Sequence, residues 1–142
     1  MAVFTGSAWV ALSSTFRSLT AARSPFGAEV RVEIVEAEAT LSGASVTTAA
    51  VIPARAIVLG VSTRTSAAVT GAISYNCGIA GETGKFGSAL GVALNASNIG
   101  VVGPSAFYAD TPVVITAAGG SFVSGKVRVA IQLLRFEAPV AE

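Results

Sequence analysis

The sequence predicts an all-β fold, a jelly-roll-like β-sandwich with a short N-terminal hairpin or arm. Three observations predict this fold class. Apolar and polar residues alternate in several runs with the two-residue period of a strand. Clusters of glycine, proline and serine separate these runs at intervals of roughly 8 to 15 residues, a spacing typical of sandwiches and jelly rolls. No window of about a dozen residues shows an apolar stripe with the period of a helix.

The first 27 residues predict a small separate unit. Residues Trp9–Leu12 indicate a short strand of a hairpin or arm, and Ser14–Gly27 has the composition of a linker. Within that linker, Ser14–Ala22 predicts a loop or one helical turn, and a helix is left open as the alternative. We therefore expect a domain boundary after Gly27, with the sandwich over residues 28–142.

Residues Ala28–Leu41 predict the first long strand of the sandwich, because apolar and charged residues alternate along them. Glu36 and Glu38 share a face with Ile34, so the alternation changes its sense near Val35. We expect a bulge or a strand end at that point. The two faces predicted for the first half are Val30, Val32 and Ile34 on one side, and Arg31, Glu33 and Val35 on the other.

Further strands are predicted along the rest of the chain. Ala56–Val61 is a nearly continuous apolar run, as expected for a strand covered on both faces. Lys126–Phe136 alternates, with Val127, Val129, Ile131 and Leu133 on one face. Shorter strands are predicted at Ile73–Cys77, Ala89–Leu94, Ile99–Val102 and Pro112–Ala117. Turns are predicted between the apolar runs at Ser42-Gly43, Gly78–Gly84, Gly103-Pro104, Asp110–Pro112 and Gly119-Gly120.

Charge and hydropathy exclude several partners. The chain has 142 residues, 9 Lys+Arg against 8 Asp+Glu and a formal net charge of +1, so we expect no nucleic-acid binding. The longest uncharged run, Phe86–Ala109, is interrupted by polar residues, Pro104 and glycines, so we expect no membrane insertion. Only 12% of residues are charged and 52% are apolar. We therefore expect another copy or another protein to cover part of the apolar surface.

The residue types that most enzymes and metal sites use are scarce. The sequence has no His and a single Cys, which removes the commonest general base and metal ligand. Cys77 is expected to be a small buried apolar residue. Gly81–Lys85 lacks the first glycine and the final hydroxyl of a phosphate-binding loop. Glu36 and Glu38 are the remaining acid pair, and such a pair on a strand is more typical of a solvated face than of a glycosidase. We expect no catalytic residue, no metal site and no cofactor.

Two tyrosines beside polar residues are candidates for contacts with a glycan. A flat ring next to a hydrogen-bonding group is typical of sugar sites, but Tyr75 and Tyr108 can equally be structural. Residues 76–87 and 95–110 hold the longest polar and Gly-rich turns, so we expect them to face outward. The candidate glycan or outward-facing contacts are Tyr75, Asn76, Asn98, Tyr108 and Asp110.

A set of short motifs is specific in combination. The run Ile52–Arg64 (IPARAIVLGVSTR) is preceded by Phe4–Val10 (FTGSAWV) and followed by several shorter matches. Together they resemble, over about two-thirds of the chain, a domain at the C-terminal ends of phage and gene-transfer-agent proteins of alphaproteobacteria. The shorter matches are Thr70–Ala72, Cys77–Glu82, Lys85–Gly87, Ser97–Gly100, Gly103–Tyr108, Thr111-Pro112, and Gly119-Gly120 with Phe122 and Gly125.

This resemblance implies a structural protein of a virion or gene-transfer particle. Its longer relatives are similar to fibre or head-spike components that contact the host's surface polysaccharide. The stretch between the Trp9 hairpin and the Ile52 run is shorter here, which fits a base, a cap or a decoration protein equally well. The implied partners are other capsid or tail proteins and further copies of the chain, in a trimer for a fibre or a pentamer for a head vertex.

The sequence thus predicts a non-enzymatic structural protein located in the virion, as a head decoration, a spike, a fibre or a tail-tip component. Phe4, Trp9 and Phe16 are the candidate segment for docking on the particle. The first alternative is a glycan-binding module for host attachment. The second alternative is a polysaccharide depolymerase that uses Glu36 and Glu38.

Overall fold

A computed structural model describes residues 2–5, 8–11 and 16–141 of the chain, and it describes side chains from Arg17 onward. These residues form eleven strands, and every pair of neighbouring strands is antiparallel. The strands are β1 (Ala2–Thr5), β2 (Ala8–Ala11), β3 (Phe16–Arg23), β4 (Glu29–Thr40), β5 (Ser45–Ile52), β6 (Ala56–Thr70), β7 (Ser74–Ile79), β8 (Glu82–Leu90), β9 (Ser97–Phe107), β10 (Thr111–Ala118) and β11 (Ser124–Glu137).

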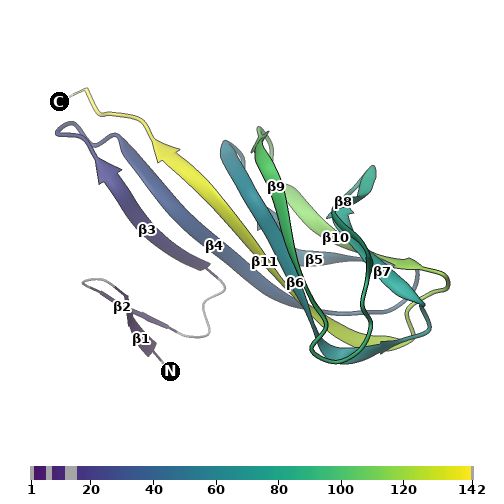
Figure 1. Cartoon of the computed structure of the whole chain (residues 1–142). Helices are drawn as coiled ribbons and strands as arrows, with labels where there is room; N and C mark the ends of the chain where they lie inside the picture. Colours follow the sequence, from purple (N-terminus) through teal and green to yellow (C-terminus); the bar gives the residue numbers. More distant parts are fainter. Residues whose placement is uncertain (1, 6–7, 12–15, 142) are drawn as a thin grey trace.

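Two packed sheets make up the sandwich. One sheet has the order β3-β4-β11-β6-β9 and the other has the order β5-β10-β7-β8. Strands β4 to β11 have the connectivity of a jelly roll: consecutive strands lie in different sheets, except for the hairpin of β7 and β8, and β3 extends the first sheet beyond β4. The predicted all-β, jelly-roll-like sandwich is therefore confirmed. Figure 1 shows that β3, β4 and β11 project past the four-stranded sheet, toward the C-terminus.

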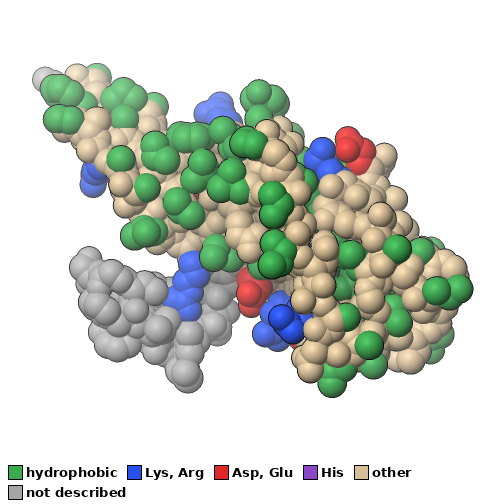
Figure 2. All heavy atoms as spheres, viewed as in Figure 1, with side chains coloured by type: hydrophobic (Ala, Val, Ile, Leu, Met, Phe, Trp, Pro, Cys, Tyr) green, Lys and Arg blue, Asp and Glu red, His purple; other side chains and the backbone are tan. Residues whose placement is uncertain are grey.

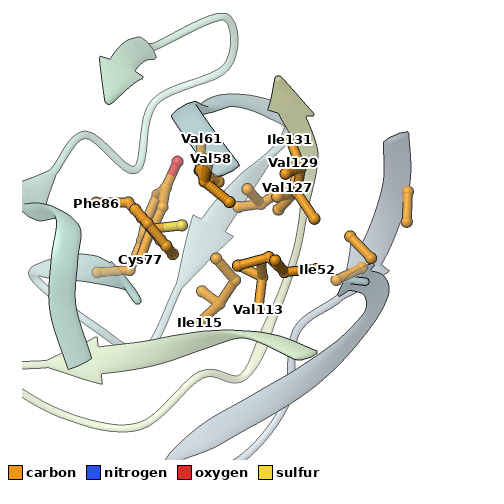
Figure 3. Close-up of a cluster of buried hydrophobic side chains, with 14 of the residues drawn as sticks. Ile52, Val58, Val61, Cys77, Phe86, Val113, Ile115, Val127, Val129 and Ile131 are labelled. Carbon is orange, nitrogen blue, oxygen red and sulfur yellow. The ribbon is translucent and has the colours of Figure 1, made fainter. Parts of the chain in front are cut away.

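The core lies between the two sheets. The inner face of β11 alternates as predicted, since Val127, Val129, Ile131 and Leu133 are all fully buried. Figure 3 shows the valines of β6 and β11 facing the side chains of the second sheet. The labelled residues of this cluster are Ile52, Val58, Val61, Cys77, Phe86, Val113, Ile115, Val127, Val129 and Ile131.

Strand β4 alternates as predicted, but its inner face is the one that carries a charge. Glu33 is 1% exposed, whereas Val32 and Ile34 on the opposite face are 41% and 40% exposed. Glu33 Oε2 lies 3.7 Å from Arg31 Nε, and Glu33 Oε1 lies 3.6 Å from Arg135 Nη1. The two guanidinium groups offset the cost of burying this carboxylate.

The bulge or strand end predicted near Val35 is wrong. The pairing of β4 with β11 is continuous from Glu29 to Thr40. Ala37 and Ala39 continue the inner face beyond Val35, so the alternation never changes its sense. Alanine is only weakly hydrophobic compared with the larger aliphatic residues of the opposite face. The sequence therefore did not reveal that Ala37 and Ala39 continue the buried face.

Strand β6 is exposed on one face, so the predicted coverage on both faces is wrong. Ile57 is partly exposed and Leu59 is 36% exposed, on the side away from the second sheet. The register of β6 with β9 shifts between Val58 and Gly60. The register of β6 with β11 shifts at the same level, between Gln132 and Leu133. This irregularity explains why the apolar run does not alternate in the sequence.

Several predicted turns and strands differ from the structure. The predicted turn at Gly78–Gly84 contains the start of β8, and the strand predicted at Ala89–Leu94 ends at Leu90. Gly103-Pro104 lies inside β9, which is an edge strand and can therefore accept a proline. Strand β5 was not predicted, because its threonines and alanines give a weak strand signal.

The N-terminal region contains one more sheet strand than predicted. The strand predicted at Trp9–Leu12 corresponds to β2, and its register places Phe4 of β1 opposite Trp9. Phe16–Arg23 forms β3 and pairs with β4, so the predicted loop or helix is wrong over residues 16–22. Pairing with a neighbouring strand overrides local propensity here. The domain boundary after Gly27 stays a prediction, and β3 pairs across it.

Candidate interaction surface

Tyr75 belongs to the core and not to the surface. Its side chain is 1% exposed, and its hydroxyl lies 3.2 Å from the hydroxyl of Thr65. The Thr65 hydroxyl also donates to the Gly91 carbonyl at 2.7 Å. Tyr75 thus has an apolar body among core residues and a satisfied polar tip. The expectation that Tyr75 is an outward-facing contact is wrong.

The two candidate asparagines tie strands together. Asn76 accepts a hydrogen bond from the backbone N–H of Ala89 at 3.0 Å, which joins β7 to β8. Asn98 donates from Nδ2 to the Phe86 carbonyl at 3.2 Å, which joins β9 of one sheet to β8 of the other. Both side chains are half-buried. These bonds give each amide a structural role, and contacts with a glycan stay a prediction.

Tyr108 and Asp110 lie at the surface, where β9 turns into β10. The side chain of Tyr108 is 85% exposed. Asp110 is exposed as well, and its Oδ1 accepts a hydrogen bond from the backbone N–H of Ala54 at 2.8 Å. Of the two candidate tyrosines, only Tyr108 is therefore available to a ligand, and the two rings do not form a shared platform.

The candidate docking segment lies at the start of the chain. Phe4 and Trp9 occupy facing positions of the β1–β2 hairpin, and Phe16 begins β3. The side chains of these three residues lie outside the described part of the chain. Among the described residues, β1 and β2 pair only with each other. The docking role of this segment stays a prediction.

An apolar row crosses the outer face of the five-stranded sheet. Leu19 of β3 faces Val32 of β4, which faces Leu134 of β11, and Leu134 faces Ile57 of β6. Exposure of this row is highest at β3, where Leu19 is 65% exposed. Figure 2 shows hydrophobic side chains gathered on this side, over β3, β4 and β11. We define the outer apolar face as Leu19, Val32, Ile34, Ile57, Leu134 and Phe136.

The outer apolar face was not recognised in the sequence. Its residues in β4 are even-numbered positions of Ala28–Leu41, and the alternation left these positions as one of two possible faces of the strand. Deciding which face is buried required the register with β11, because Leu133 and Leu134 are both apolar. Two consecutive leucines in a strand point to opposite faces of the sheet, so they do not show which face is buried.

The other end of the same outer face is charged. Glu36, Arg64 and Arg128 border a shallow hollow of about 400 Å³, whose floor includes Ser62 and Ala130. The five-stranded sheet therefore presents an outer surface that is apolar toward one end and charged toward the other.

Glu38, one of the two acids of the depolymerase alternative, takes part in hydrogen bonds on the outer face of the five-stranded sheet. Glu38 Oε2 accepts hydrogen bonds from the Ser66 hydroxyl at 2.8 Å and from Arg128 Nη2 at 2.9 Å. These two bonds lower the pKa of Glu38 below its usual value of 4.5. A glycosidase needs one carboxyl group with a raised pKa as its general acid. The surroundings of Glu38 therefore do not suit the role of that general acid, and the depolymerase alternative stays a prediction.

Two further observations concern the described ranges alone. Within them, no three His, Cys, Asp or Glu side chains gather closely enough to hold a metal ion. The same ranges contain no helix with the length and apolar character needed to cross a membrane.

The fold and the outer surface define the chain as a jelly-roll β-sandwich with one partly apolar sheet face. No family model matches the sequence, and no match was found among curated proteins. The chain is similar to a chain in the structure of the cyanophage Pam1 capsid asymmetric unit, with 27% sequence identity and a TM-score of 0.58. The match covers 82% of this chain and 92% of the other, so the two chains have similar lengths.

This similarity supports a structural, non-enzymatic protein of a phage particle, in agreement with the predicted class and location. The more specific resemblance to alphaproteobacterial fibre or spike domains stays a prediction. The same holds for the predicted oligomer and for contacts with a polysaccharide.

Proposed function

We propose that the chain is a decoration protein on the head of a phage or phage-like particle. The observation that carries this proposal is the similarity to a chain of a cyanophage capsid, which extends over 92% of that chain. A match of that extent spans most of both chains and not a short shared fragment. A spike, a fibre and a tail-tip component are the other positions that the resemblance of the sequence implies.

The proposed mechanism is self-association through apolar β faces together with attachment by the N-terminal segment. The outer apolar face exposes several large apolar side chains together, and such faces are usually contact surfaces. The segment with Phe4, Trp9 and Phe16 links the sandwich to its neighbours in the particle. A trimer or a pentamer, each with closed symmetry, would bury the apolar faces of all copies equally.

The proposal is tested on particles purified through a density gradient and treated with protease and nuclease to remove loosely bound material. We expect mass spectrometry to find the chain at a fixed ratio to the main shell protein, and antibody labelling to place it on the head. Absence of the chain from purified particles would contradict the proposal. Labelling at the tail alone would replace decoration by a fibre or tail-tip role.

A glycan-binding role in host attachment is the second candidate. The exposed ring of Tyr108, next to Asp110, is the observation that favours it. The variant Tyr108→Ala should then weaken binding of host polysaccharide without lowering the melting temperature, and Tyr108→Phe should retain most of the binding. Equal binding by the unmodified protein and by Tyr108→Ala would contradict this role.

A further inference from the structure

Strand β9 forms one edge of the five-stranded sheet, and it carries no charge. Among the described strands it pairs with β6 alone, as Figure 1 shows. It lies within residues 86–109, the longest uncharged run of the chain. The side chains of Ile99 and Val101 are 78% and 77% exposed. A long, uncharged edge strand with exposed aliphatic side chains can readily pair with a strand of another chain.

The opposite edge of the same sheet carries charges. Strand β3 has an arginine near each end, Arg17 and Arg23. Charged side chains on an edge strand disfavour pairing between edges, because the new pair would desolvate them or bring like charges together. Strand β9 has no such residue, so another feature must protect its edge.

The first part of the β9 edge is close to the second sheet. The Asn98 side chain donates from Nδ2 to the Phe86 carbonyl of β8 at 3.2 Å. At Gly100 the backbone comes so near the same carbonyl oxygen that a Cβ atom would not fit between them. Strand β8 therefore lies against the beginning of β9, and residues 101–107 are the part of this edge that another strand could reach.

That second part of β9 contains a bulge at Gly103-Pro104. Two successive pairs of the β6–β9 ladder enclose a single residue of β6, Leu59, but three residues of β9, 102–104. The two extra residues interrupt the regular spacing of backbone donors and acceptors that an added strand would need. Pro104 also has no backbone N–H to donate. The bulge thus lies where the edge would otherwise be open.

We propose that the Gly103-Pro104 bulge closes the β9 edge to strand pairing between copies of the chain. On this uncharged strand the bulge has the protective role that arginines have on β3. The proposal goes beyond the proposed function, because it concerns the free chain and does not depend on a position in a particle.

The test removes the bulge and keeps the rest of the chain. Deletion of Gly103 and Pro104 leaves Val102 alone opposite Leu59, so that each residue there faces one residue of β6. A second variant, Pro104→Val, keeps the two extra residues but restores the backbone N–H. Pro139→Val is the matched control, because Pro139 is exposed in the tail after β11. Analytical ultracentrifugation at several concentrations measures the size distribution, and circular dichroism and the melting temperature check folding.

We expect the deletion variant to stay folded and to form larger species than the unmodified chain, with an association constant about tenfold higher or more. Hydrogen exchange at residues 101–107 should be slower in these species, because the new strand protects the backbone N–H groups. Adding Val101→Lys to the deletion should reverse the association, since a lysine on an edge strand disfavours pairing. Pro104→Val should associate less than the deletion variant and more than Pro139→Val.

A folded deletion variant with the size distribution of the unmodified chain at every concentration would overturn the proposal. Association without slower exchange in β9, or association that Val101→Lys leaves unchanged, would also overturn it, because the contact would then lie elsewhere. If the deletion variant does not fold, the comparison of Pro104→Val with Pro139→Val decides, and equal association of these two overturns the proposal. The proposed function fails separately, through absence of the chain from purified particles.

Discussion

Tyr75 and Tyr108 look alike in the sequence, yet the fold gives them opposite environments. Each ring lies beside a polar residue, and this pattern made both tyrosines candidates for a glycan contact, with a structural role as the alternative. Tyr75 is at an inward position of β7, whereas Tyr108 follows the last residue of β9 and is 85% exposed. A tyrosine fits both places because its ring is apolar and its hydroxyl is polar. The sequence could therefore identify the candidates but not choose between them.

Substitutions at the two tyrosines should separate these environments. Tyr75→Phe should lower the free energy of unfolding by about 1 kcal/mol, because the hydrogen bond to Thr65 is lost. Tyr75→Ala should lower it by about 3–5 kcal/mol, because a large cavity is left in the core. Tyr108→Ala should change it by less than about 0.5 kcal/mol. Urea unfolding measures all three, and a comparable loss for Tyr75→Ala and Tyr108→Ala would contradict the described core.

Cys77 should be unreactive in the folded protein. The thiol is fully buried in the core, and this burial raises its pKa from 9.0 to about 12. A thiol reagent at pH 8 should therefore label the native protein far more slowly than the protein in denaturant. Rapid labelling without denaturant would show that the core opens around Cys77.

The same thiol makes stability depend on alkaline pH. The unfolded chain loses the proton near pH 9 and the folded chain only near pH 12. The contribution to stability is therefore complete below pH 9, and it falls as the pH rises toward 12. Cys77→Ala provides the control, since it should remove this part of the pH dependence.

Single strands were predictable where one face is buried and the other is wet. Strand β11 meets this condition, so its inner valines and leucine could be assigned from the alternation alone. The alternation of strand β4 left open which face is buried, because the contacts of Glu33 with Arg31 and Arg135 come from the fold and not from the local pattern. Strand β3 was missed because its ladder with β4 outweighs its own weak strand signal.

The close approach of β9 to β6 and β8 should make one glycine irreplaceable. A Cβ atom at Gly100 would lie 2.2 Å from the Val61 carbonyl oxygen and 2.4 Å from the Phe86 carbonyl oxygen. Gly100→Ala should therefore force the strands apart and lower the free energy of unfolding by about 1–3 kcal/mol. Gly103 in the same strand has nothing within 4 Å of such an atom, so Gly103→Ala is the matched control. Equal unfolding free energies for both variants would contradict this packing of β9.

At the scale of the whole molecule, the jelly roll was predictable from strand periodicity and turn spacing. The outer apolar face was not, because it depends on register across β3, β4, β11 and β6. The virion role followed from the resemblance of the motifs, and the similarity to a cyanophage capsid chain supports it. The position of the protein on a particle depends on its contacts with other proteins. The sequence and structure of a single chain show only the surfaces that are available for such contacts.

The central claim is that this jelly roll is part of a phage head. Cryo-electron microscopy of purified particles tests it most directly, because a two-sheet sandwich of this shape can be fitted into density. The account predicts density on the head shell that accommodates β3 to β11, at symmetric positions with a defined copy number. Head density that leaves no place for the sandwich, in particles whose other proteins are all accounted for, would contradict it.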